Sequence, residues 1–220
     1  NKKISLKTPI DIYIPCFQPD EDLEKCLHSV LEHTHCEYNL TVIVGKRSIA
    51  KNRNAGLRQG VSEWICSLDS DCQVTQDDWL DLLLETAKSQ PNVGIVGAKI
   101  VMFDGTIFSA GTGGNGLPML YGEKDIGQRE IVEEVHAVSE NCLLMRKGIF
   151  EFDEWFWQSK SSEGQDACMR LRKQGYKNLY DGRVKIQQNK YPSKKSPFNW
   201  DHLYFHLKHP STILTQYRKP

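Results

Sequence analysis

The feature that most constrains the fold is an alternation of short apolar strands with helical segments near the start of the chain. IDIYIP at residues 10–15 alternates apolar and polar positions, and the apolar segments LTVIVG and EWICSL follow it. A helix capped by Asp20 and a second helix over residues 49–59 separate these strands. Because a strand followed by a helix and another strand favours parallel pairing, this order predicts a parallel sheet.

The next segments extend this pattern and then end it. Thr75 begins a leucine-rich helical pattern that runs to about Lys88, and the strand segment VGIVGA follows. Between IVMF and TIFS, Asp104 and Gly105 predict a two-residue hairpin turn of type I′, because both residues tolerate the positive φ that this turn requires. The parallel pattern therefore ends near residue 104.

The rest of the chain has a mixed α+β pattern. It contains a glycine-rich loop at residues 111–116, a strand near NCLLMR, a helix over about 163–173 and a strand near VKI. We therefore predict one α/β domain over residues 1–220, with a Rossmann-like, mostly parallel sheet flanked by helices. Its expected parts are residues 9–104 for that sheet, 105–190 for the mixed half, and 191–220 for a C-terminal loop and helix.

Composition limits the partners and the compartment. The 28 basic and 28 acidic side chains cancel, so no overall field would draw the chain to nucleic acid. No apolar run approaches the roughly 20 residues that a transmembrane helix needs, and seven scattered cysteines without a C-x-x-C pair indicate free thiols in a reducing compartment. We expect a cytoplasmic domain. Because the chain opens on Asn1, we also expect it to be part of a longer protein, whose other segments could hold it at the cytosolic face of a membrane.

Asp69, Ser70 and Asp71 are the first candidate site residues. They follow the strand segment WICSL directly, at the carboxyl end of a predicted parallel strand, where open α/β sheets bind their ligands. Two carboxylates one residue apart can share a hard divalent cation with the phosphates of a bound nucleotide. A solvated acidic turn is the alternative interpretation of these residues taken alone.

Six segments in order extend this interpretation to most of the chain. They are DIYIPCFQP, KNRNAGL, SLDSDC, DGTIFSAG, CLLMRKGIFEFDEWF and EGQDACMRLRKQGYK. Together, over residues 9 to about 188, they resemble the inverting glycosyltransferases of family 2, which have an A-type nucleotide-sugar-binding fold. The resemblance implies transfer from a nucleotide-sugar donor to a glycan, lipid-linked or protein acceptor, as in polysaccharide biosynthesis, with residues 9–104 binding the donor and 105–190 the acceptor.

The resemblance also implies a donor site and a metal site. Asp71 and Asp69 would hold a divalent metal, Mn²⁺ or Mg²⁺, with Asp69 near the ribose of the donor. A guanidinium near a helix start can also pair with diphosphate oxygens, and Arg53 is placed for this role. The residues that the resemblance assigns to the nucleotide pocket are Pro15, Cys16, Gln18, Arg53, Asp69 and Ser70.

Two carboxylates are candidates for the base that takes the proton of the acceptor hydroxyl. By resemblance these are Glu163 and Asp166, which can share one face of the first turn of their helix. Arg170 lies four residues after Asp166 and would form an ordinary helix ion pair with it, so we favour Glu163. Trp155 and Trp157 precede this segment and are candidate acceptor contacts, because aromatic faces pack on sugar rings.

The sequence departs from the family pattern at several positions. Gly164 stands where the family commonly has an Asp, and Gly45-Lys46-Arg47 replaces an acidic contact to the base of the donor nucleotide. Gln188, with Gln187 next best, stands where a histidine often completes the metal site, and an amide oxygen is a weaker ligand. Three histidines could replace the missing metal-binding histidine, namely His202, His206 and His209. Such residues are more often simply polar positions on a helix.

These departures keep other functions open. One alternative is a catalytically inactive module that binds sugar nucleotides or glycans. A nucleotidyltransferase is a second, but it would need a basic, glycine-rich loop after the first strand, where this chain has the acidic PCFQPDED. The glycines of residues 111–116 match a dinucleotide fingerprint, yet LPMLYG follows them instead of a helix, which argues against a Rossmann dehydrogenase.

Overall fold

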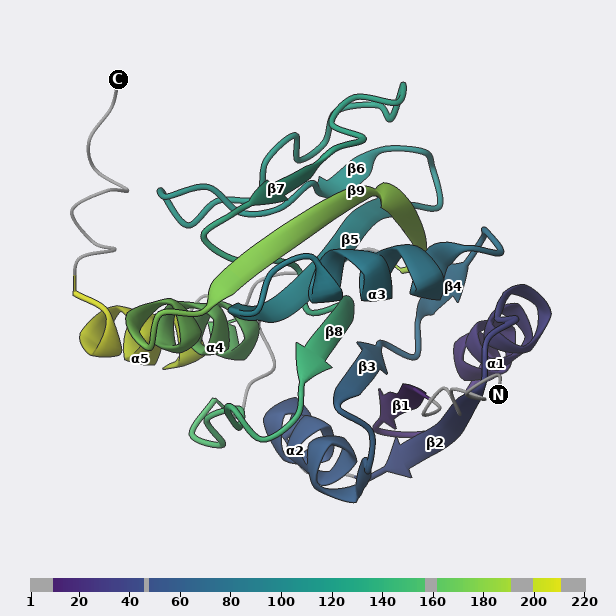
Figure 1. Ribbon diagram of the computed structural model, residues 1–220, viewed down its shortest axis with the longest axis horizontal. Coiled ribbons are helices and arrows are strands. Elements are labelled where there is room, and N and C mark those ends of the chain that lie inside the picture. The colour runs from purple at the N-terminus through teal and green to yellow at the C-terminus, as the bar shows by residue number, and fades with distance from the viewer. Residues whose placement is uncertain (1–9, 46–47, 157–161, 191–199, 211–220) are drawn as a thin grey trace, which may run out of the picture.

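The structure of the chain is a computed structural model that describes residues 10–45, 48–156, 162–190 and 200–210. Figure 1 shows a twisted sheet with helices on both sides. The elements are β1 (Ile10–Cys16), α1 (Glu21–His33), β2 (Tyr38–Val44), α2 (Ile49–Gln59), β3 (Trp64–Leu68), β4 (Cys72–Val74), α3 (Trp79–Lys88), β5 (Val93–Met102), β6 (Ile107–Ser109), β7 (Val132–Glu134), β8 (Cys142–Arg146), α4 (Ser162–Lys173), β9 (Lys177–Gln188) and α5 (Trp200–Lys208).

The strands form one mixed sheet in the order β2-β1-β3-β8-β5-β9-β4, with β6 paired to β5 and β7 paired to β9. β1 is parallel to both β2 and β3, and β5 is parallel to β9. β8 is antiparallel to both β3 and β5, so β5 and β9 run in the same direction as the first three strands. This arrangement confirms the predicted α/β fold with a mostly parallel sheet flanked by helices.

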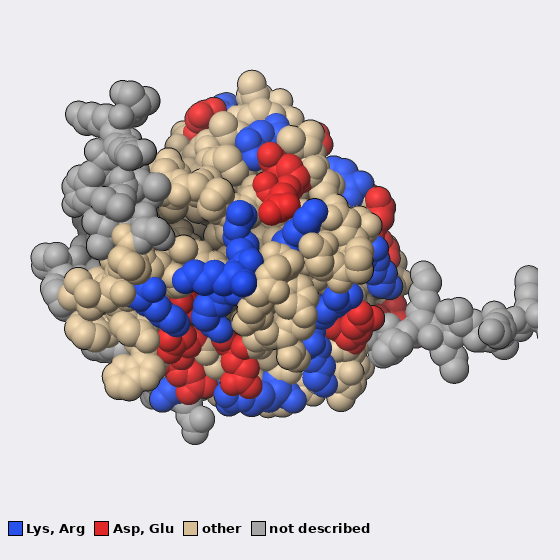
Figure 2. Space-filling view, turned by 60° about the vertical axis from the view of Figure 1, so that its left-hand side comes forward, with Lys and Arg blue, Asp and Glu red and all other residues tan. Residues whose placement is uncertain are grey.

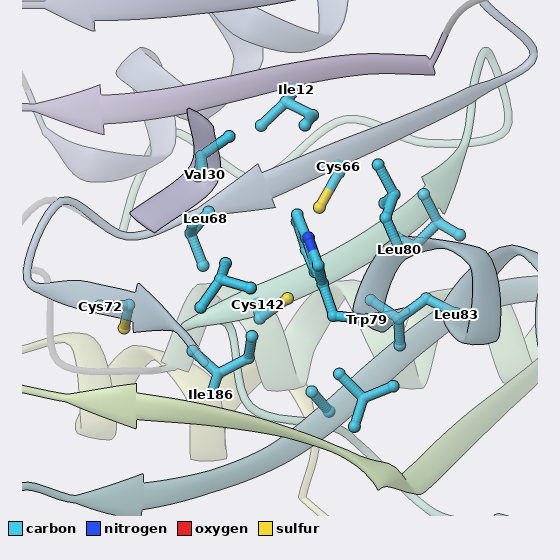
Figure 3. Packing of buried hydrophobic residues seen from close by; sticks show 14 of the residues in the cluster. Ile12, Val30, Cys66, Leu68, Cys72, Trp79, Leu80, Leu83, Cys142 and Ile186 are labelled. Carbon is cyan, nitrogen blue, oxygen red and sulfur yellow. The ribbon is translucent and has the colours of Figure 1, made fainter. Parts of the chain in front are cut away.

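Each face of the sheet is covered by its own helices. Ile12 and Ile14 of β1 belong to the core cluster that includes α1 and α3, whereas Tyr13 belongs to the cluster on the other face with α2 and α4. Both faces are therefore buried, as expected for parallel strands between helical layers. Figure 3 shows Trp79 of α3 inserted among the apolar side chains of the first cluster, beside Cys66 and Cys142.

α2 lies very close to β1. A Cβ atom added to Gly56 of α2 would lie 2.4 Å from the ring carbons of Tyr13, which is 2% exposed. A glycine is therefore required where the helix crosses this ring. α2 has the predicted bounds, and Asp20 caps α1 as predicted, because its side chain accepts a hydrogen bond from Leu23 N at 3.1 Å.

Two local predictions were wrong. α3 begins at Trp79 rather than Thr75, since the side chain of Gln76 is hydrogen-bonded to the backbone of β9, where it accepts from Lys185 N at 3.0 Å. The hairpin turn is not of type I′, because Gly105 has a positive φ of 81° and Asp104 does not. The carboxylate of Asp104 accepts hydrogen bonds from the Thr106 backbone and hydroxyl, and the turn contains three residues with glycine last.

The cysteines are free thiols, six of them buried and Cys36 partly buried. In the part of the chain that the structure describes, no helix is both long and apolar enough to cross a membrane. Figure 2 shows basic and acidic side chains interspersed on one face of the molecule, in keeping with the equal numbers of the two charges.

Candidate active site

The carboxyl ends of β1 and β3 lie at one edge of the sheet, because these strands are parallel neighbours. Asp69 follows β3 directly, and its backbone N–H donates to the carbonyl of Asn141 at 2.9 Å. Asn141 precedes β8, which runs antiparallel to β3 and therefore starts where β3 ends. The topology thus brings Glu140 and Asn141 beside Asp69 from a distant part of the sequence.

Arg53 connects the side chains that meet at this end of the sheet. It extends from α2, is 1% exposed, and donates to Glu163 Oε1 at 2.7 Å and to Asp69 Oδ1 at 2.8 Å. Its Nη2 also lies 3.4 Å from the carbonyl oxygen of Glu140. Burial alone would lower the pKa of Arg53, but the charges of Asp69, Glu163 and Glu140 raise it above its usual range. A permanently charged guanidinium therefore joins three segments that are far apart in the sequence.

Asp71 and Gln188 meet across the turn that leads into β4. Gln188 Nε2 lies 3.5 Å from Asp71 Oδ2, and the Asp71 carbonyl accepts from Asn189 N at 2.8 Å. Burial, followed by the charge of Asp69, raises the pKa of Asp71 to about 6. Among the described atoms, the buried Oε1 of Gln188 has no hydrogen-bond partner. The structure thus places the three predicted metal ligands at one sheet edge.

Glu163 lies in the first turn of α4 and is 1% exposed. Burial and the neighbouring charge of Glu140 raise its pKa, against the opposite effect of Arg53. Its Oε2 atom has no hydrogen-bond partner within the described segments. Gly164, the next residue, has no side chain, and the carboxylate of Glu140 lies over it.

Asp166 has a different environment from Glu163. It is fully buried and contacts Arg170 Nε, Lys208 Nζ and His209 Nε2 at 2.7, 2.8 and 2.8 Å. Burial would raise its pKa, but the hydrogen bonds from His209 and Lys208 and the charge of Arg170 lower it to about 2. The predicted ion pair with Arg170 is present, and the remaining contacts join α4 to α5.

His202 and His206 of α5, and His209 directly after it, are not arranged as a metal site with Asp71. His202 and His206 contact each other, with their Nε2 atoms 3.1 Å apart, and His209 contacts Asp166. Figure 1 places α5 at one end of the view and β4 at the other. The described segments contain no group of three or more His, Cys, Asp or Glu side chains arranged to hold a metal ion.

The other predicted donor residues lie around the end of β1. Pro15 and Cys16 are its last two residues, and the Cys16 thiol lies beside Ser70 of the turn between β3 and β4. Gln18 follows on an exposed stretch. Among the predicted acceptor contacts, Trp155 is 70% exposed, and Trp157 lies outside the described residues.

Glu140 is a residue of this site that was not predicted from the sequence. No motif marks this residue, which stands two positions before a strand in the segment SENCLL. The one indication was Gly164, where the resemblance led us to expect a carboxylate next to Glu163. A missing side chain in a buried site indicates that another residue fills the space, but the sequence does not say which.

Solved structures with the same arrangement define the class of this fold. GalNAc-T7 with UDP, GalNAc and Mn²⁺ aligns with a TM-score of 0.65 at 11% identity, over 94% of this chain and 51% of that one. S. aureus TarS 1-349 aligns with a TM-score of 0.61 at 15% identity, over 96% and 67%. The chain has the A-type glycosyltransferase fold.

Sequence comparisons give the family. The sequence model described as glycosyl transferase family 2 matches residues 37–152, so the chain belongs to this family of glycosyltransferases, which confirms the resemblance. It is similar to the uncharacterized protein y4gI of Sinorhizobium fredii, with 29% identity over 140 residues, or 58% of this chain and 15% of that protein. The O-antigen biosynthesis protein RfbC of Myxococcus xanthus is 27% identical over 157 residues, or 65% of this chain and 12% of that protein. The chain therefore spans less than a sixth of the length of either relative.

Proposed function

We propose that the chain moves a sugar from a nucleotide diphosphate sugar to an acceptor hydroxyl, with inversion at the anomeric carbon and with help from a divalent metal. The observation that carries this proposal is the buried Arg53, which holds Asp69 at the donor edge of the sheet and Glu163 at the start of α4. The donor would bind along the ends of β1 and β3, at the place where open α/β sheets bind their ligands.

The types of side chain at this edge are those that bind divalent cations in proteins. Asp71 and Asp69 supply carboxylate oxygens, and the buried, unpartnered Oε1 of Gln188 could face Asp71 after the amide turns about its last bond. Two carboxylates and one amide leave coordination positions for diphosphate oxygens and water, as Mg²⁺ and Mn²⁺ prefer. When bound, such a cation would neutralise charge on the departing diphosphate.

A carboxylate close to Arg53 would then accept the proton of the attacking hydroxyl. Glu163 is the candidate that the sequence predicts for this role, and Asp166 the second. Asp166 is already bound to three cationic groups, which makes it a weak base and a structural link to α5. In-line attack by the acceptor oxygen on the face opposite the diphosphate would give inversion at the anomeric carbon.

The names of two similar proteins favour a particular acceptor class and a particular donor as the first to test. RfbC of Myxococcus xanthus is named for O-antigen biosynthesis, which favours a glycan or lipid-linked glycan as acceptor. GalNAc-T7 was solved with UDP and Mn²⁺, which favours a UDP-sugar and Mn²⁺ as the first donor and metal to test. The exposed Trp155 is the proposed acceptor contact.

The test is release of the nucleoside diphosphate from a panel of UDP-, GDP- and dTDP-sugars, with Mn²⁺ or with a chelator. We expect release that requires metal and is lost in Asp71→Ala. Asp81→Ala is the matched control, because Asp81 is exposed on α3, away from the site, and should retain activity. Binding of nucleotide without release from any donor would contradict the proposal. It would favour the inactive binding module, an alternative that the glycine at position 164 keeps open.

A further inference from the structure

Glu140 and Gly164 share one space at the site. A Cβ atom built on Gly164 would lie 2.4 Å from Glu140 Oε2 and 3.2 Å from both the Cβ and the Cδ of Glu140. A contact of 2.4 Å is too short for a carbon and an oxygen that are not bonded, so any side chain at position 164 would displace the Glu140 carboxylate. The volume that a residue at position 164 would fill is therefore occupied by a carboxylate from another segment.

Glu140 lies at the same edge of the sheet as the donor residues. It is 7% exposed, and its carbonyl is 3.4 Å from Arg53 Nη2. The next residue, Asn141, accepts the backbone N–H of Asp69. The charge of Glu140 acts on both Arg53 and Glu163. The Arg53 guanidinium thus binds the carboxylates of Asp69 and Glu163 and lies next to the Glu140 carbonyl, within range of the Glu140 charge.

Glu163 is already used within this cluster. Its Oε1 is bound to Arg53 at 2.7 Å, and 1% of the residue is exposed, so an acceptor hydroxyl would have to displace Arg53 or reach Oε2 through packed atoms. The hydrogen bond from Arg53 to Glu163 holds in place the guanidinium that also binds Asp69. This geometry suits a residue that positions Arg53 better than one that meets a substrate.

We propose that Glu140 is the catalytic carboxylate that accepts the acceptor proton, and that Gly164 is present to make room for it. The inference rests on the proposed function. As the acceptor oxygen forms its bond to the anomeric carbon, its proton passes to the Glu140 carboxylate. The bond between the anomeric carbon and the diphosphate oxygen breaks, and its electron pair leaves with the nucleoside diphosphate. Glu163 is a positioning residue that acts through Arg53.

The experiment compares Glu140→Gln with Glu163→Gln in nucleotide release from the donor panel, with water as the acceptor, since water must lose a proton to the same base. For Glu140→Gln we expect kcat to fall by about 10²- to 10⁴-fold, with the Kd for UDP in Mn²⁺ unchanged within about threefold. For Glu163→Gln we expect weaker UDP binding as well, because Arg53 loses its second support. Glu32→Gln, at an exposed position on α1, is the matched control.

A second pair of variants tests the shared space without depending on one substitution. Gly164→Asp alone should lower both the thermal midpoint and kcat, because its side chain collides with Glu140. Glu140→Gly with Gly164→Asp returns one carboxylate to the same volume, and kcat should recover at least about tenfold over Glu140→Gly alone, a fraction of the base contribution. No recovery would overturn the idea that one carboxylate serves both positions.

The outcomes separate this inference from the proposed function. An active wild-type chain with a Glu140→Gln variant that keeps its kcat within threefold would overturn the role of Glu140 and leave the transferase proposal intact. A wild-type chain that binds UDP but releases nucleotide from no donor would overturn the transferase proposal, and the role of Glu140 with it.

Discussion

Removing the Arg53 guanidinium should destabilise the fold strongly. In Arg53→Met the side chain keeps much of its length but loses the charge that neutralises Glu163, which is 1% exposed. Breaking a buried ion pair by removing one partner costs about 3–5 kcal/mol, because the other charge remains buried without compensation. The Asp69 side chain is 21% exposed and can turn toward water, so most of the loss should come from Glu163.

The assay is urea unfolding at pH 8 and at pH 5. Burial raises the pKa of Glu163 in the folded state, and loss of Arg53 raises it further. A carboxyl group whose pKa is raised by folding destabilises the folded state once the group is ionised. The free energy lost in Arg53→Met therefore grows as the pH rises above the unfolded pKa of about 4.3. We therefore expect the free energy of unfolding to fall by about 3–5 kcal/mol at pH 8 and by clearly less at pH 5.

Two variants control this measurement. Arg58→Met removes an arginine from the same helix, where it pairs with Glu151 in an exposed contact, and should cost only about 0–1 kcal/mol. Arg53→Met combined with Glu163→Gln should be less destabilised than the sum of the single variants, by at least about 1 kcal/mol. A loss below about 1 kcal/mol for Arg53→Met at pH 8, or strict additivity in the double variant, would contradict the role of Arg53 as a buried counter-charge.

Two further predictions concern stability. The hydrogen bonds and charges that lower the Asp166 pKa to about 2, from 3.8, stabilise the fold fully above about pH 4. Unfolding free energies of the wild type should therefore fall as pH drops from about 4 to 2, and Asp166→Asn should flatten this fall; an unchanged slope would contradict the assignment. Gly56→Ala should lower the free energy of unfolding by about 1–3 kcal/mol in urea, because its Cβ would lie 2.4 Å from the Tyr13 ring. Gly105→Ala, which meets no atom within 4 Å, is its comparison and should lose only what its positive φ costs; equal losses would contradict the packing explanation.

Local patterns in the sequence were sufficient for much of the fold. Asp20 was predicted as a helix cap and the second helix as residues 49–59, and both are present, because caps and helical periodicity depend on residues a few positions apart. The parallel order of the first strands was predicted from the alternation of strands and helices along the chain. Thr75 failed as a helix start because Gln76 binds β9, a partner more than a hundred residues away that no local pattern can show.

The candidate site divides in the same way. Asp69 and Asp71 were identifiable because a strand end and a short motif place them, and Glu163 because a family motif includes it. The contacts of Arg53 with Asp69 and Glu163 join α2 to the end of β3 and to α4, and Glu140 lies over Gly164 because β8 enters the sheet between β3 and β5. The sequence by itself therefore determined most of the elements, although not the short strands β4 and β7, and most of the charged residues at the site. Only the tertiary structure decided which of those charges neutralise one another, since burial and distance set that and neither is encoded in neighbouring residues.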